Sequence, residues 1–253
     1  MDLPINTNSK SGTFGAFARS KAIAVAGIFS IAMTAQGAPV TLQQPTATFS
    51  QTFFSIADAI DNGPSSGWAI DPQEGSPQTA VFETATDLFT SGGTLTFTMA
   101  QNFGSGHTIG RLRWSATTDD RSLFADGFIS NGNVSANWVV LDPVSLASAN
   151  GATLTELGDN SILVSGVSPS VDTYTISATT LLAGVTGLRL EVLKDLSLPA
   201  NGPGRQPSNG NFVLTNLTVD ATPAVVPLPP ALMLMGTGLL GMLGFVRTNR
   251  SRH

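Results

Sequence analysis

The stretch Gly93-Thr-Leu-Thr-Phe-Thr-Met99 alternates strictly between apolar side chains and hydroxyl-bearing ones. Successive side chains of a β-strand point to opposite faces, so Leu95, Phe97 and Met99 would share one face and the threonines the other. This pattern predicts a strand that is buried on one face only, as is common in antiparallel sheets.

Similar alternation recurs along the chain in short segments that turn sequences separate, as is typical of all-β domains. Further strands are predicted at 112–116, 137–141, 161–165, 172–177, 187–192 and 211–219. Turn-forming sequences separate them, among them Asn62-Gly63, Asn131-Gly132, Asn150-Gly151 and Asn209-Gly210. Away from the two ends of the chain, no segment has apolar residues at helical spacing. We therefore predict an all-β fold, an antiparallel jelly-roll-like β-sandwich over 38–222.

One long stretch, Leu196 to Gly210, interrupts this rhythm with three prolines and three glycines. Loops of this length inside a compact domain are usually functional or disordered. The stretch is therefore a candidate for a binding loop.

Composition and charge exclude several functions. The chain contains no cysteine, which removes thiol chemistry and disulfides. From Ala38 to Thr222 there are 16 acidic and 6 basic residues, a net charge of −10. Such a domain repels nucleic acid and anionic membrane surfaces, but it is compatible with neutral sugars or divalent cations.

The chain closes with a short proline motif, an uncharged apolar run over 231–246 and a basic tip. A helix rises about 1.5 Å per residue, so one over 225–246 would cover roughly 30 Å and form a transmembrane helix. Basic residues after a span stay in the cytoplasm, which places the preceding chain outside. The motif residues are Val226, Pro227, Leu228 and Pro229, and the basic residues are Arg247, Arg250 and Arg252.

This order of motif, span and tip resembles the PEP-CTERM sorting signal of Gram-negative bacteria, in its Val-Pro-Leu-Pro variant. Leu228 stands where the usual motif has Glu. The resemblance assigns the sorting signal to 223–253 and implies recognition by an exosortase, a membrane cysteine protease. That enzyme would cut near the motif and pass the protein to the cell surface or the extracellular polymer. A plain C-terminal membrane anchor is the alternative.

The N-terminal end has the features of a secretory signal peptide. Three basic residues precede a short apolar stretch, 22–33, and small residues follow at Ala35 and Gly37. We assign the signal peptide to 1–37, with cleavage between Gly37 and Ala38. The Sec translocon and signal peptidase are therefore expected partners, and an uncleaved anchor is the alternative.

Three groups of motifs in the central domain show a second resemblance. They include Gly67-Trp-Ala-Ile-Asp71, Gly106-His-Thr-Ile-Gly-Arg-Leu-Arg-Trp-Ser115 and Leu198-Pro-Ala-Asn-Gly-Pro-Gly-Arg205. Together they resemble a discoidin-like, galactose-binding-like jelly-roll module that is found in large secreted bacterial proteins. The resemblance covers most of Ala47 to Val219. It implies carbohydrate binding at a loop end, sometimes with a structural calcium ion.

Trp68, Arg205 and Asn211 are the predicted ligand-binding residues. A tryptophan on a loop can stack on a sugar ring, and an arginine near a loop tip can bind a carboxylate or a sugar hydroxyl. Two structural alternatives stand beside this prediction. Trp68 would fill the core, as we also expect of Trp114 and Trp138, and Arg205 would tether a loop that lacks regular hydrogen bonds.

Four side chains near one turn are candidate calcium ligands: Asp58, Asp61, Asn62 and Asp71. Hard cations need several oxygen ligands, which neighbouring carboxylates and amides can supply. The spacing does not match an EF-hand loop. The alternative is that these side chains bond local backbone N–H groups in Asx-turns. A structural Ca²⁺ ion is thus the only cofactor that the sequence suggests.

The catalytic inventory of the central domain is small. His107 is its only histidine, so a zinc site cannot be built, and no Gly-x-Ser-x-Gly elbow accompanies it. Acidic residues are plentiful, but nothing marks a particular catalytic pair. We therefore predict that the protein is not an enzyme.

These observations predict an exported β-sandwich protein that an exosortase-type system sorts to the cell surface or the exopolysaccharide and biofilm matrix. The protein would pass through a membrane-tethered intermediate during sorting. Its final role would be structural, or to interact with other components of the matrix. The first alternative is a carbohydrate-binding module that holds polysaccharide, assisted by calcium. The second alternative is a glycoside or ester hydrolase built on paired acids.

Overall fold

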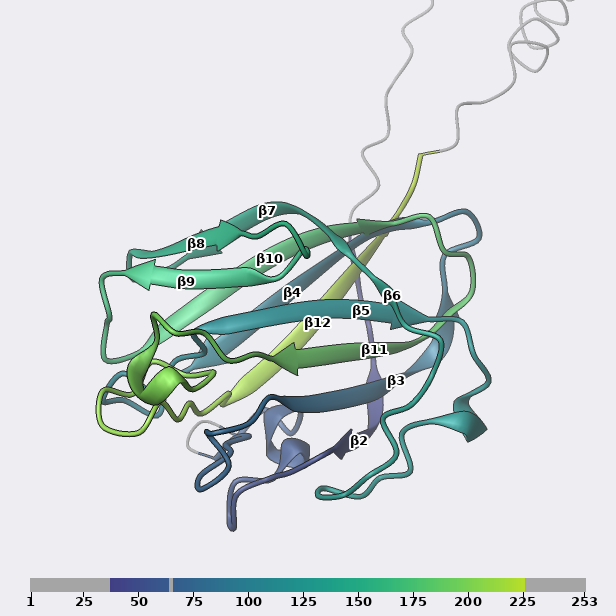
Figure 1. Cartoon of the computed structure of the whole chain (residues 1–253). Helices are drawn as coiled ribbons and strands as arrows, with labels where there is room; N and C mark the ends of the chain where they lie inside the picture. Colours follow the sequence, from purple (N-terminus) through teal and green to yellow (C-terminus); the bar gives the residue numbers. More distant parts are fainter. Residues whose placement is uncertain (1–36, 64–65, 226–253) are drawn as a thin grey trace, which may run out of the picture. The chain divides into compact units, whose positions relative to one another are not determined.

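The computed structural model describes residues 37–63 and 66–225 (Figure 1). The predicted signal peptide up to Gln36 lies outside the described residues. So do the sorting motif from Val226, the predicted span and the basic tip. Within the two described ranges, no helix is long and apolar enough to cross a membrane.

The described residues form twelve strands and three short 3₁₀ helices. In chain order these are β1 (Ala38–Pro39), β2 (Leu42–Ala47), η1 (Ile56–Ala59), β3 (Gln78–Leu88), β4 (Gly93–Gln101), β5 (Arg111–Thr117), η2 (Arg121–Leu123), β6 (Val139–Val140), β7 (Asp142–Ser148), β8 (Ala152–Glu156), β9 (Ile162–Gly166), β10 (Asp172–Thr180), β11 (Val185–Val192), η3 (Pro199–Asn201) and β12 (Asn216–Pro223).

The strands form two sheets that pack face to face (Figure 1). The first sheet has the order β1-β12-β4-β10-β7, and the second has the order β2-β3-β11-β5-β9-β8, with β6 paired to β5. Every strand pairing in the described residues is antiparallel. The predicted all-β, antiparallel sandwich is therefore confirmed.

The core lies between the two sheets, as the period-two pattern predicts. Leu95, Phe97 and Met99 on β4 are fully buried. The ring of Phe97 stacks on that of Trp114 from β5, with 4.0 Å between the centroids. Each large apolar side chain buried in this way contributes about 1.5 to 3 kcal/mol, so the two inner faces account for most of the stability.

Two predicted strands differ from the observed ones. In the segment 137–141, only Val139 and Val140 pair as a strand. The preceding loop lies over the outer face of the second sheet, where Trp138 packs edge-on against Phe124 and covers the guanidinium of Arg189. The prediction that Trp138 fills the core is confirmed only in part, because Trp138 is partly buried against this small outer cluster and not between the two sheets.

The second difference is the strand predicted at 211–219, which begins only at Asn216. Residues 212–214 are buried but irregular, because Leu214 pairs with Trp68 in an isolated bridge instead of joining a sheet. The segment therefore connects a loop to the sandwich before the strand starts.

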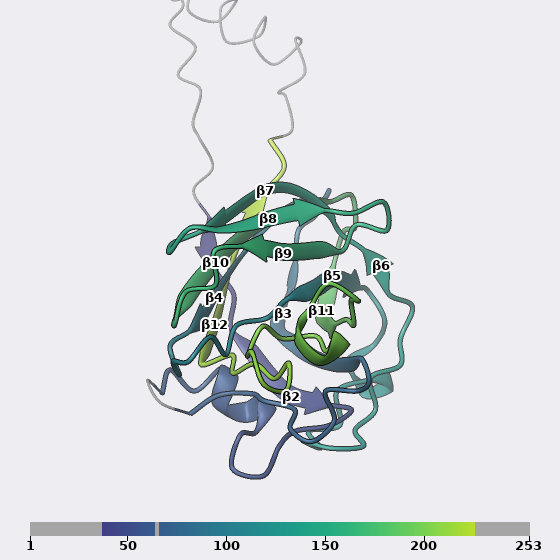
Figure 2. The same ribbon diagram turned by 60° about the vertical axis from the view of Figure 1, so that its left-hand side comes forward.

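The two ends of the described chain lie side by side. In the first sheet Ala38 pairs with Ala221, so the chain enters and leaves at one end of the sandwich. We call this the tether end; it includes the turns 89–92 and 181–184. The loops 102–110, 167–171 and 193–215 lie at the opposite end, which we call the loop end (Figure 1). Figure 2 brings the loop end forward, with η3 and its loop in front of β11.

Candidate functional site

Trp68 lies in the interior of the loop end. Its side chain is fully buried, its ring packs edge-on against Phe212 at 5.2 Å, and its Nε1 donates to the Phe49 carbonyl oxygen at 3.0 Å. Gly67 must be a glycine, because a Cβ there would lie 2.4 Å from the carbonyl oxygen of Leu214. The structure corrects the prediction that Trp68 meets a sugar ring and supports the alternative that it fills the core.

Arg205 ties the long loop to its neighbours. The residue is only 6% exposed, and its Nη2 donates to the carbonyl oxygens of Gly166 at 3.0 Å and Val167 at 2.9 Å. Its backbone N–H donates to the Thr108 carbonyl oxygen at 2.7 Å. These contacts match the tethering alternative. They hold the guanidinium against backbone carbonyls, at the wall of a shallow hollow of about 320 Å³ that Leu198 and Pro207 also line.

Asn211 also ties the long loop to neighbouring segments of the loop end. Its side chain is buried, Oδ1 accepts the Ile70 N–H at 3.2 Å, and Nδ2 donates to Gln51 Oε1 at 3.1 Å. A Cβ at Gly204 would lie 2.1 Å from the Asn211 carbonyl oxygen, so the loop packs on itself here. The three predicted ligand residues therefore stabilise the loop end from inside and form no shared surface.

The predicted calcium ligands have local backbone partners. Asp58 Oδ2 accepts the Ser55 N–H at 3.1 Å and caps η1, and Asp61 Oδ1 accepts the Gly63 N–H at 2.6 Å. Asn62 adopts a left-handed backbone conformation, as turns require. In the described part of the chain, no three acidic or histidine side chains are placed to hold one metal ion.

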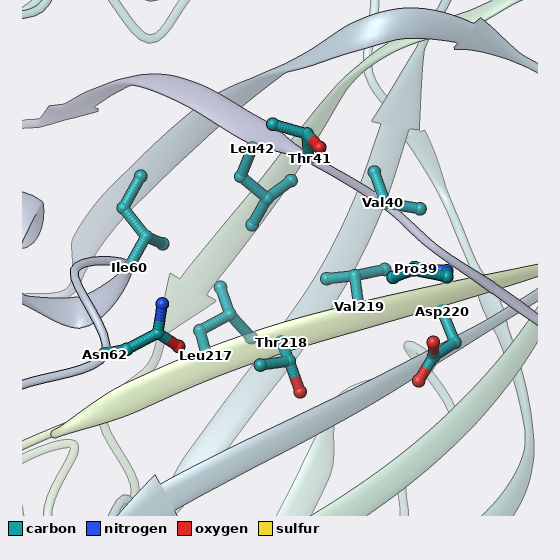
Figure 3. A pocket seen from close by; sticks show the side chains of 10 residues that line it. All are labelled: Pro39, Val40, Thr41, Leu42, Ile60, Asn62, Leu217, Thr218, Val219 and Asp220. Carbon is teal, nitrogen blue, oxygen red and sulfur yellow. The ribbon is translucent and has the colours of Figure 1, made fainter.

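Asn62 also lines an open groove of about 330 Å³ along β12 (Figure 3). Its other lining side chains are mainly apolar or hydroxyl-bearing, with Asp220 as the one carboxylate. Figure 3 shows Asn62 and Asp220 at opposite ends of this groove. Calcium needs six to eight oxygen ligands around one point, which this separation does not provide.

The fourth predicted calcium ligand, Asp71, lies beside Glu74. Glu74 is buried, and its Oε1 accepts a hydrogen bond from Asn209 Nδ2 at 2.8 Å. Burial raises the pKa of the Glu74 carboxyl above its usual value, and the hydrogen bond and negative charge of Asp71 add to this. The hydrogen bond between Asn209 and Glu74 links the 71–76 turn to the long loop.

A cluster of three rings lies at the surface of the loop end, and sequence reasoning missed it. The ring of Phe103 is edge-to-face with that of Phe54, at 5.4 Å between centroids, and with that of His107, at 5.1 Å. Phe103 is 45% exposed. We call Phe54, Phe103 and His107 the aromatic tip.

The backbone of loop 102–110 holds Phe103 in this position. Gly104, Ser105 and Gly106 all have positive φ, of 101°, 54° and 75°. Glycine reaches this region without a steric penalty, so the chain can turn sharply behind the ring. Ser170 fixes the turn, because its Oγ accepts the Ser105 N–H and its carbonyl oxygen accepts the Gly106 N–H, both at 3.0 Å.

Polar groups border the aromatic tip. Nδ1 of His107 lies 2.8 Å from the Gly104 carbonyl oxygen, a contact that requires the proton on Nδ1. In the neutral ring Nε2 is then an acceptor. Asn102, the residue before Phe103, is exposed, and its side-chain amide offers both a donor and an acceptor. The tip thus combines an accessible aromatic ring with hydrogen-bonding groups.

The signal for this site was present but weak in the sequence. An aromatic residue directly before Gly104-Ser-Gly106, in a predicted connection between strands, indicates a ring carried on a tight turn. The partner ring of Phe54 lies on a different loop, so only the folded chain shows the cluster.

Comparison with known proteins gives remote likenesses only. No protein-family model and no curated protein sequence matches the chain. Among solved structures it is similar to the family 32 carbohydrate-binding module of NanJ from Clostridium perfringens in complex with galactose, with 10% identity, 72% of this chain and 99% of that chain covered, and a TM-score of 0.38. It is also similar to a CBM32 module, CBM32-3, from a family 31 glycoside hydrolase of Clostridium perfringens, with 12% identity, coverages of 70% and 88%, and a TM-score of 0.39.

Proposed function

We propose that the domain is a non-catalytic carbohydrate-binding module whose ligand contacts the aromatic tip. The observation that carries this proposal is the ring of Phe103, which is 45% exposed and braced by two other rings. Sugars present C–H patches beside hydroxyl groups. A fixed ring next to Asn102 and His107 offers a partner for each.

The charge of the domain narrows the ligand class. With 16 acidic and 6 basic residues between Ala38 and Thr222, the domain repels polyanions at long range. A neutral polysaccharide faces no such repulsion. We therefore assign neutral glycans as the ligand, held by stacking and hydrogen bonds rather than by charge.

The proposal includes export and sorting to the cell surface or the polymer matrix by an exosortase-type system. Its support is the sequence of the two ends of the chain, together with the opposite placement of the tether end and the loop end. A domain attached at one end would present the aromatic tip at the other. A structural role in the matrix and glycan binding are compatible, because a matrix protein can hold polymer.

Binding of the full-length protein to a glycan array of neutral oligosaccharides and polysaccharides tests the site. We expect Phe103→Ala to weaken binding about 5- to 150-fold, because loss of one stacking ring costs about 1 to 3 kcal/mol. Titration calorimetry with the strongest array ligand measures the change. Phe128→Ala removes an exposed phenylalanine from a different loop and should leave affinity unchanged. An array without any ligand, or equal affinity of the two variants, would contradict the proposal.

Intact-mass measurement of the protein from its native host tests the sorting step. We expect the protein recovered from the outer fraction to begin near Ala38 and to end near Val226, with or without an added modification. The two predicted cleavages would produce this mass. A mass that extends through His253 would instead indicate a membrane anchor that is not processed.

A further inference from the structure

The described domain continues almost to the predicted sorting motif, without a long linker between them. Strand β12 continues to Pro223, and the Ala224 N–H donates to the Gly92 carbonyl oxygen at 3.0 Å. Residues 221–223 therefore belong to the sheet. The apolar run starts at Ala231, seven residue steps after Ala224. Fully extended, they reach at most about 25 Å, so a membrane-spanning tail would keep the tether end close to the lipid.

One part of the surface at the tether end, next to the turn between β10 and β11, is apolar. Leu181, at the turn between β10 and β11, is 95% exposed, and Val139 is about half exposed. Together with Val140 and Leu182 they line a shallow hollow of about 330 Å³. We call these four residues the tether patch.

The tether patch adjoins the point where the chain leaves the domain. A Cβ placed on Gly92 would lie 2.9 Å from the Cα of Leu181, so the two residues touch. The same Gly92 accepts the last backbone hydrogen bond of the described chain, from Ala224. Leu181 and Ala224, where the chain leaves the domain, therefore both lie against Gly92.

The chemistry of the patch fits a shallow lipid contact. Its hollow is otherwise lined by Thr179 and Thr180, which suit the polar interface, and by one acid, Asp142. A carboxylate does not enter a hydrocarbon core, and it is mildly repelled by anionic lipid. The patch can therefore meet lipid at the headgroup level, as apolar side chains of interfacial proteins do.

We propose that the tether patch rests in the headgroup region of the bilayer that the C-terminal segment spans. This inference rests on the membrane-tethered intermediate of the proposed function, and it is independent of glycan binding. Strand β4 runs from the tether end at Gly93 to the loop end at Gln101, roughly 26 Å at 3.3 Å per residue. Contact at the tether patch therefore orients the domain and holds the aromatic tip away from the membrane.

The absence of cysteine from the chain makes the test direct. Leu181→Cys in the full-length protein provides a single labelling site for an environment-sensitive fluorophore. Leu196→Cys is the matched control, because it is an 89% exposed leucine at the loop end. Each labelled protein is reconstituted into phosphatidylcholine vesicles, with and without headgroup-proximal spin-labelled lipid, and vesicle flotation confirms attachment. We expect the label at 181 to lose most of its emission to the spin-labelled lipid and the label at 196 to lose none.

Three outcomes would overturn the proposal. Equal emission of both labels, with attachment intact, shows that the patch does not touch lipid. A response at 181 that depends on protein density, but not on spin-labelled lipid, shows that a second copy covers the patch. Failure of the chain to float with the vesicles shows that the C-terminal segment does not span the bilayer, and the proposed lipid contact then has no basis. None of these outcomes affects the Phe103 test of glycan binding.

Discussion

Replacement of Trp68 by alanine is expected to lower the free energy of unfolding by about 3 to 5 kcal/mol. The side chain is fully buried, and the ring of Phe212 packs against it at 5.2 Å. The substitution leaves a cavity and also deprives the Phe49 carbonyl oxygen of its partner. In a domain of this size each kcal/mol lowers the melting temperature by about 2 to 4 °C, so a loss of roughly 10 °C is expected.

Phe103→Ala is the matched control for this experiment. Phe103 is also an aromatic residue of the loop end, but almost half of it is exposed. Its removal should change the melting temperature little while it weakens glycan binding. Calorimetric melting curves and glycan titrations of the two variants separate the roles. If Trp68→Ala kept its melting temperature and lost glycan binding, Trp68 would be a ligand residue, which is one of the two roles that the sequence leaves open.

The strands were predictable because burial of one face of a strand requires apolar and polar residues to alternate along the sequence. Leu95, Phe97 and Met99 point into the core and the threonines between them point out, so a local pattern carries the information. The same holds for β10 and β11, whose buried and less buried residues alternate over much of their length. Where a strand is only two residues long, as in β6, no pattern can form.

The proposed binding surface was not predictable, because residue type does not tell which side chains are exposed to solvent. Trp68 and Arg205 are special residues in a loop, and the sequence marks them as such. Their environment is set by distant partners, the bridge to Leu214 in one case and the carbonyl oxygens after β9 in the other. The opposite holds for Phe103. Its loop sequence is ordinary, and its place in the proposed site depends on contact with Phe54 on another loop.

Substitution of Arg205 by methionine is expected to destabilise the domain by about 2 to 3 kcal/mol. Hydrogen bonds from a charged donor each contribute roughly 1.5 to 3 kcal/mol. The substitution removes Nη2, which donates to the carbonyl oxygens of both Gly166 and Val167. The net loss is smaller than the sum of these bonds, because Nη1 of Arg205 is buried without a hydrogen-bond partner and its desolvation is relieved. The melting temperature should fall by about 4 to 12 °C.

The same substitution should also weaken glycan binding, although Arg205 does not belong to the aromatic tip. The turn that Arg205 holds leads directly to Ser170, and Ser170 fixes the backbone behind Phe103 through Ser105 and Gly106. Arg205 is thus a positioning residue for the ring. Arg205→Lys should restore little, because a single ammonium group lacks the planar fork that reaches several carbonyl oxygens.

Arg113→Met is the control for this second prediction. Arg113 makes a bidentate ion pair with Glu191 on the outer face of the second sheet, where it is partly exposed. Its loss should cost about 1 kcal/mol or less and leave glycan affinity unchanged. Melting curves and glycan titrations of the three arginine variants decide between two roles of Arg205. Loss of binding at full stability in Arg205→Met would make Arg205 a direct ligand contact, whereas loss of both properties together follows from a turn that no longer holds Phe103 in place.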